Sequence, residues 1–153
     1  MHKYEAKVTW SRNGAKFTGQ QYSRGHEWSF DGGIKIPASA SPQVVRAPLS
    51  VAEAIDPEEA LVASASSCHM LTFLSLASKQ GFVVDAYEDD AFGLMEKNEK
   101  GKYAITRITL RPKIRFSREK QPSASELSAL HHAAHEECYI ANSIKSEVTV
   151  EAQ

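Results

Sequence analysis

The two cysteines of this 153-residue chain are the residues best suited to do chemistry. Cys68 lies inside a stretch without charge, residues 60–78, and Cys138 follows seventy residues later. The first ten residues, MHKYEAKVTW, hold no apolar segment typical of a secretory signal, so we expect a reducing, cytoplasmic location. There a cysteine pair is more often redox-active or metal-bound than structural. The alternative is that Cys68 is only a small core residue.

A reactive thiol in an apolar helix needs a cation nearby. Burial disfavours the thiolate form of a cysteine, whereas a neighbouring positive charge favours it. Arginine suits this task because it stays charged when partly buried. Arg24, within an aromatic segment, is the candidate. Glu58 lies ten residues before Cys68, about 15 Å along a helix axis, so it could act only by orienting an arginine. Its alternative role is a first-turn partner of the helix dipole.

The segment 131–138, HHAAHEEC, permits a metal site. His131 and His135 are four residues apart and could bind one ion from one helix face, with Cys138 or a glutamate nearby. The spacing defines no third ligand, and an exposed histidine-rich helix face is the commoner arrangement. We therefore expect neither a metal nor a resident cofactor.

One long helix is expected to carry Cys68. Asp56 is a good N-cap, Pro57 fits the first helical position, and Gly81 can end the helix. Because the residues between these ends are apolar or small, the sequence predicts a helix over 56–81 that is buried on every face. Its apolar runs are short and its ends are charged, which indicates the core helix of a soluble protein and not a membrane span.

Strands are expected on both sides of that helix, and a second helix near the end. Alternation of apolar and polar residues and the turn residues predict strands within 3–10, 17–30, 82–97, 104–116 and 144–151, and a long irregular loop over 34–50. Pro112 indicates an edge position or a bulge. Ser123 and Glu126 form a capping box for a helix that runs to about Cys138. This order predicts one α+β domain over residues 1–153 with a mostly antiparallel sheet.

The charge balance and the apolar helix restrict the partners. With 18 basic and 19 acidic residues, the chain lacks the strongly basic surface of proteins that bind nucleic acids or anionic membranes. A helix that is apolar on every face also needs more cover than one small sheet and one helix provide. A second copy of the chain is the simplest source of that cover, so we expect a homodimer.

These residues together resemble the OsmC/Ohr family of thiol-dependent peroxidases. The most specific part is the run PEEAL at 57–61, followed by SSC at 66–68 and by Cys138 at the end of a late helix. The resemblance spans nearly the whole chain. It implies an OsmC-like α+β fold, with mostly antiparallel sheets wrapped with two helices around a buried central helix. It also implies an intertwined homodimer with two active sites at the interface.

The resemblance implies roles for four residues. Cys68 looks like the peroxidatic thiol, Cys138 like the resolving thiol, and Glu58 like the carboxylate that positions an activating arginine. That arginine is Arg24, with Arg12 and Arg46 as alternatives. The implied activity is reduction of organic hydroperoxides, with hydrogen peroxide as a second candidate, through a Cys68 sulfenic acid and a Cys68–Cys138 disulfide. An external dithiol, from a lipoyl protein or a thioredoxin-like protein, would restore the thiols.

Three features depart from the family pattern. Cys138 is followed by Tyr-Ile-Ala-Asn-Ser, where many relatives have a proline directly after the cysteine; the loop over 34–50 is long; and His69 follows Cys68 directly. They bear on substrate size and on the geometry of the resolving step. The alternative function is a non-catalytic ligand- or metal-binding dimer of the same fold, which would use the cluster of His131 and His135 or the interface pocket.

Overall fold

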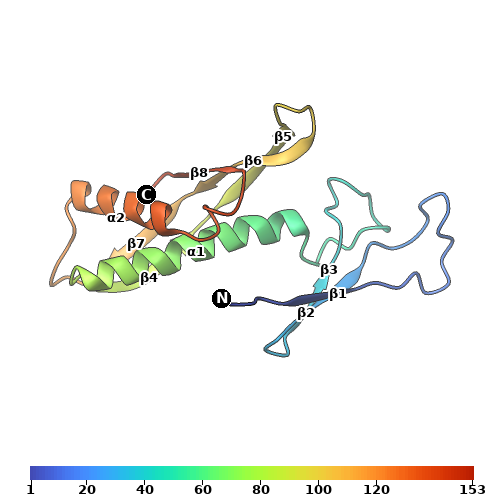
Figure 1. The fold of residues 1–153 in the computed structure, drawn as a ribbon, viewed down its shortest axis with the longest axis horizontal. Helices are drawn as coiled ribbons and strands as arrows, with labels where there is room; N and C mark the ends of the chain where they lie inside the picture. Colours follow the sequence, from blue (N-terminus) through green and yellow to red (C-terminus); the bar gives the residue numbers. More distant parts are fainter. The chain divides into compact units, whose positions relative to one another are not determined.

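The computed structural model describes all 153 residues. The chain divides into two compact units, Met1–Ala60 and Leu61–Gln153, and helix α1 (Pro57–Lys79) runs through the boundary (Figure 1). The single domain that the sequence predicts stays a prediction. The α+β class is confirmed, with two helices and strands that pair mostly antiparallel.

The first unit contains one antiparallel sheet of three strands. Strand β2 (His26–Phe30) lies between β1 (Ala6–Thr9) and β3 (Lys35–Ala38). The segment 17–30, for which the sequence allows one strand or two short ones, is therefore strand only in its last five residues. The reason is a second turn at Gly19 and Gln20, where both residues have positive φ angles. The predicted irregular loop over 34–50 is wrong in its first part, because β3 pairs with β2 after the turn at 31–33.

Helix α1 begins and ends as the sequence predicts. The Glu59 backbone N–H donates to the Asp56 carboxylate at 2.8 Å, and the Asp56 N–H donates back to the Glu59 carboxylate at 3.2 Å. This reciprocal pair satisfies two of the amides that a helix start leaves free. Gly81 follows the last turn with a φ of 78°, a conformation that favours glycine.

Only one side of α1 is buried within a single chain. The buried residues recur every four positions: Ala65, His69, Phe73 and Ala77. The other side is exposed at Ala63, Ser67, Leu71 and Ser75. The helix is long and apolar enough to cross a membrane by length and composition. Because its buried side packs in the core of the second unit, it is a core helix. The predicted burial on every face is not reached within one chain, since the second unit covers one side only.

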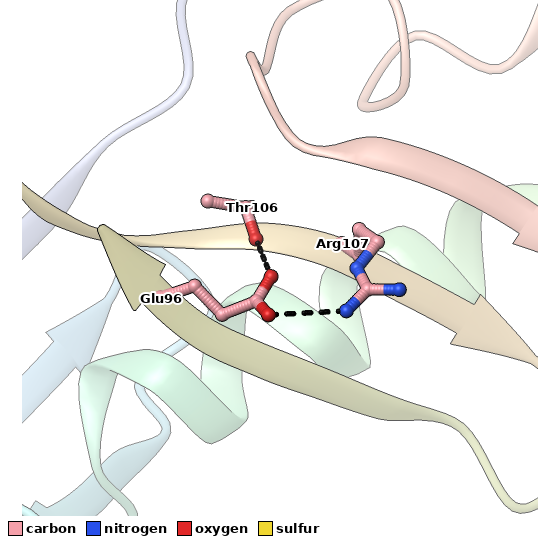
Figure 2. Close-up of polar contacts among 3 residues, drawn as sticks. All are labelled: Glu96, Thr106 and Arg107. Atoms are coloured by element: carbon pink, nitrogen blue, oxygen red, sulfur yellow. Dashed lines mark hydrogen bonds and ion pairs between the residues drawn. The ribbon is translucent and has the colours of Figure 1, made fainter. Parts of the chain in front are cut away.

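The second unit contains two small sheets. Strand β4 (Val84–Asp89) pairs antiparallel with β7 (Pro112–Phe116). The other sheet has the order β5 (Phe92–Lys97), β6 (Tyr103–Leu110), β8 (Glu147–Val150), in which β8 runs parallel to β6. The outer side of the β5–β6 pair carries an exposed polar cluster, in which the Glu96 carboxylate accepts hydrogen bonds from Thr106 at 2.7 Å and from Arg107 at 3.1 Å (Figure 2).

Two predicted strands are each divided between these sheets. The segment 82–97 changes sheet after Asp89, and the segment 104–116 changes sheet at Arg111. The two crossings face each other, because the Arg111 N–H donates to the Asp89 carboxylate at 2.6 Å and its guanidinium donates to the Asp90 carbonyl at 2.8 Å. Pro112, which lacks an N–H, is the first residue of β7, as suits a residue that cannot donate within a ladder.

Helix α2 (Ala124–Glu137) closes the core of the second unit. Ser123 and Glu126 form the predicted capping box, and Cys138 is the C-cap. Helix α2 lies beside α1 (Figure 1), and the shared core contains Phe73, Ala77, Phe82, Leu130 and Ala134. A second cluster joins the first half of α1 to β6 through Ala65, Ile108 and Leu110. These two clusters hold both helices in place and thereby position both cysteines.

Candidate active site

The two cysteines occupy different positions on their helices. Cys68 lies in the middle of α1 and is half-buried, whereas Cys138 caps the C-terminus of α2 and is buried. Both thiols are free. The Cys138 N–H donates to the His135 carbonyl at 3.2 Å, which sets the point where α2 ends. Helix α1 therefore holds the Cys68 sulfur in its middle, and helix α2 holds the Cys138 sulfur at its end.

The turn after α2 brings the two sulfur atoms into one site. The Ile140 N–H donates to the Cys68 Sγ at 3.5 Å, and the Ala141 N–H donates to the Cys138 Sγ at 3.4 Å. The two thiols therefore form a near pair although they are seventy residues apart in the sequence. Two thiols in such a pair can exchange between a reduced form and a disulfide.

The two thiols differ in their surroundings. Burial raises the pKa of the Cys138 thiol, and the neighbouring Cys68 raises it further. The N–H groups of Ala141 and Ile140 act in the opposite direction. At neutral pH, Cys138 is therefore largely a neutral thiol, which is less nucleophilic than a thiolate. This arrangement suits a cysteine that reacts second, after its partner has been oxidised.

A pair of buried histidines joins α1 to α2. His69 Nε2 and His131 Nδ1 share a hydrogen bond of 3.0 Å, and the two rings are nearly parallel, with an interplanar angle of 9°. Burial lowers the pKa of His69 to about 4, assisted by His131 and His135, and burial also lowers the pKa of His131. Both rings are therefore neutral at pH 7. The remaining nitrogens, His69 Nδ1 and His131 Nε2, are buried without a partner.

This pair bears on the metal alternative. His131 faces the core and bonds to His69, so it does not lie on an exposed histidine-rich face with His135. No group of three or more His, Cys, Asp or Glu residues lies where it could hold a metal ion. The pairing of His69 with His131 is not among the contacts predicted from the sequence. The spacing of His69 with Ala65 and Phe73 could have placed His69 on the buried side of α1, but it does not identify His131 as its partner.

Arg24 and Glu58, which the resemblance assigns to the same site, belong to the first unit. The Arg24 guanidinium lies 4.0 Å from the Tyr22 ring centroid and donates to the Gln20 carbonyl at 2.9 Å. The three ion pairs of the structure involve neither Arg24 nor Glu58. Arg12, one of the alternatives, donates to the Ala15 carbonyl at 3.0 Å. The pairing of Arg24 with Glu58 and its role toward Cys68 stay predictions.

Comparison with solved structures shows the fold clearly. The chain is 52% identical to an OsmC-like protein of unknown function from Vibrio cholerae, with 100% of each chain covered and a TM-score of 0.98. It also matches the organic hydroperoxide resistance protein OhrB of Bacillus subtilis at 21% identity, 98% coverage of each chain and a TM-score of 0.69. An organic hydroperoxide resistance protein from Elizabethkingia anophelis matches at 16% identity, covering 100% of this chain and 98% of that one, with a TM-score of 0.71.

The family assignment rests on a sequence model in addition to these structures. No match was found among the curated proteins. The model of the family described as OsmC-like protein matches residues 50–153, which include α1, both cysteines and all of the second unit. With more than half of the chain matched, and with a fold shared with organic hydroperoxide resistance proteins, this chain belongs to the OsmC-like protein family.

Proposed function

We propose that this protein is a cysteine-based peroxidase that reduces organic hydroperoxides. The observation that carries the proposal is the near pair of Cys68 and Cys138, held by the turn after α2. The fold is one that solved organic hydroperoxide resistance proteins share, which supports the choice of substrate class. Cys68 is the attacking residue in this proposal because it is the less buried of the two thiols. Cytoplasmic action, where reductants are available, belongs to the same proposal.

The chemistry proceeds in two balanced steps. The Cys68 thiolate attacks the distal peroxide oxygen, the O–O bond breaks, and Cys68 becomes a sulfenic acid while the alkoxide takes a proton and leaves as an alcohol. The Cys138 thiolate then attacks the Cys68 sulfur, and hydroxide leaves and is protonated to water. The product is a Cys68–Cys138 disulfide. An external dithiol, supplied by a lipoyl or thioredoxin-like protein, reduces this disulfide and completes the cycle.

The proposal keeps Arg24 as the cation that favours the Cys68 thiolate and Glu58 as the residue that orients it. Both assignments come from the family resemblance. An Arg24→Ala variant is expected to react more slowly with peroxide, and Arg12→Ala and Arg46→Ala are the matched controls. If one of the controls loses activity and Arg24→Ala does not, the cation has been assigned to the wrong arginine.

The proposal also includes a homodimer. The exposed side of α1 carries small residues and Leu71, which is 61% exposed in the single chain. A second copy that covers this side would give the helix the burial that its apolar sequence calls for. Leu71→Asp is expected to shift the protein toward monomer in sedimentation experiments. His132→Asp, at an exposed position of α2 and outside the exposed side of α1, is the control.

The decisive experiment is mass spectrometry of alkylated protein before and after one equivalent of an organic hydroperoxide. We expect both thiols to become unavailable together and a Cys68–Cys138 peptide to appear. Cys68→Ser should lose peroxide consumption, whereas Cys138→Ser should consume one equivalent and stop at the sulfenic acid. The proposal is wrong if both thiols stay free after peroxide, or if Cys68→Ser retains full turnover with a dithiol reductant. Free thiols in that experiment would favour the binding role.

A further inference from the structure

The backbone of the turn after α2 contributes two hydrogen-bond donors to the thiol pair. Successive amides, those of Ile140 and Ala141, donate to Cys68 Sγ at 3.5 Å and to Cys138 Sγ at 3.4 Å. The Ile140 N–H also acts on Cys138, since it opposes the rise in the pKa of that thiol. One amide, that of Ile140, therefore lies close to both sulfur atoms.

The turn that carries this amide is firmly held. Asn142 donates from its side chain to the Glu136 carbonyl at 2.8 Å and to the Cys138 carbonyl at 3.0 Å. The Ser143 hydroxyl donates to the Tyr139 carbonyl at 2.6 Å. The Ile140 side chain packs against the buried cluster of α1 and β6. The Ile140 N–H is thus fixed before any reaction begins, so it can stabilise charge without a reorganisation cost.

We propose that the backbone N–H of Ile140 is a catalytic group that stabilises negative charge at the thiol pair. This inference rests on the proposed function and adds a donor to it. In the first step the N–H donates to the Cys68 thiolate, because a hydrogen bond to an ionised acceptor is stronger than one to a neutral acceptor. In the second step it lies beside the Cys138 thiolate that attacks and the Cys68 sulfur that is attacked. Because the N–H belongs to the turn that begins at Cys138, the donor and the second nucleophile move together.

The test removes this single N–H and keeps every side chain. Native chemical ligation can join residues 1–137, made as a thioester, to a synthetic peptide from Cys138 to Gln153 that carries the α-hydroxy analogue of isoleucine at position 140. The ester that results has no N–H. We expect the rate of Cys68 alkylation by iodoacetamide at pH 7 to fall about tenfold, as for loss of one hydrogen bond to a charged group. Formation of the sulfenic acid with an organic hydroperoxide should slow by a similar factor.

Three controls isolate the effect of the N–H. The all-amide semisynthetic protein controls for ligation. An ester at Lys145, an exposed residue whose N–H donates to no acceptor in the structure, controls for a backbone ester as such. Ser143→Ala controls for weakening of the Tyr139 carbonyl, since an ester also weakens the carbonyl that precedes it. The inference is wrong if the Ile140 ester alkylates at the rate of these controls.

A second measurement avoids the question of whether the ester folds. In the unmodified protein, the Ile140 amide proton resonance should move as Cys68 ionises, and this response should vanish in Cys68→Ala. An Ile140 resonance that does not respond, or responds equally in Cys68→Ala, overturns the inference. If the alkylation effects appear but no protein reacts with hydroperoxides, the proposed function fails while the role of the amide in activating the thiol stands.

Discussion

The contact between α1 and α2 has two halves of different character. Toward one end, Phe73, Ala77 and Leu130 are fully buried and form an apolar cluster. Toward the other end, the contact contains the His69–His131 pair, with two ring nitrogens that have no partner, and beyond it the two cysteines. Apolar burial stabilises a fold, whereas buried polar atoms without partners cost free energy. The comparison indicates that the apolar half holds the helices together and that the polar half places reactive groups at a cost in stability.

The sharpest test of the apolar half is Phe73→Ala. The Phe73 side chain is completely buried and lies against His131, Tyr87 and Phe116. Removing it should lower the free energy of unfolding by about 3–5 kcal/mol, because a cavity remains. Urea denaturation measures this loss. Val83→Ala, at a side chain that is 52% exposed, should stay near the parent. The rate of thiol alkylation per folded molecule should be unchanged, and a large change would show that the two halves are not separate.

Variants of the His69–His131 pair test how the polar half contributes to the free energy of unfolding. His131→Leu alone should cost about 1–3 kcal/mol, because it leaves His69 Nε2 buried without its partner. The double variant, His69→Leu with His131→Leu, should recover most of that loss, since it removes all the unsatisfied nitrogens. A double-mutant cycle by urea denaturation measures the coupling. Additive losses would mean that the histidines stabilise the fold as ordinary packing residues.

The sequence predicts those features of the fold that residues close together in the chain determine. The ends of α1 and α2 were predicted correctly, because Asp56, Gly81 and the Ser123–Glu126 box act within a few residues. The division of two strands at Asp89 and Arg111 was not, because alternation continues across a point where only a tertiary contact changes the sheet. Local patterns also do not show which side of α1 stays exposed in a single chain.

In the candidate site, too, some groups could be predicted from the sequence and others could not. The roles of Cys68 and Cys138 came from the family resemblance, and the structure places these two residues together. The His69–His131 pair joins residues 62 positions apart, which no local spacing reveals. The Ile140 N–H could not have been found at all, because nearly every residue has a backbone N–H and only the fold decides which one faces a sulfur. Reactive side chains can thus be read from a sequence sooner than the groups that activate them.

The pH dependence of stability should also distinguish the two halves. Burial holds the pKa of His69 near 4, below its usual value of 6.5, so between these values the unfolded chain binds more protons than the folded one. The contribution of His69 to stability is therefore complete above pH 6.5 and is lost as the pH falls through this range toward 4. We expect a loss of about 3 kcal/mol, which denaturation at several pH values measures.

Variants assign this loss to the buried pair. The double leucine variant should lose less stability than the parent between pH 6.5 and 4, whereas His132→Ala, on the exposed side of α2, should follow the parent. Asp89 and His135 also act on the pair, so their titration is common to the parent and to the control. An unchanged slope in the double leucine variant would mean that carboxylates elsewhere cause the acid loss.

The smallest effect is expected at the exposed cluster of Glu96, Thr106 and Arg107 (Figure 2). Its polar atoms are paired with one another, but solvent screens the ion pair, whose side chains are about half exposed. Glu96→Gln should therefore leave the urea midpoint and the alkylation rate of both cysteines within experimental error. A clear loss of thiol reactivity in Glu96→Gln would contradict the comparison of the two halves of the α1–α2 contact. It would show that an exposed cluster outside this contact also controls the reactivity of the cysteines.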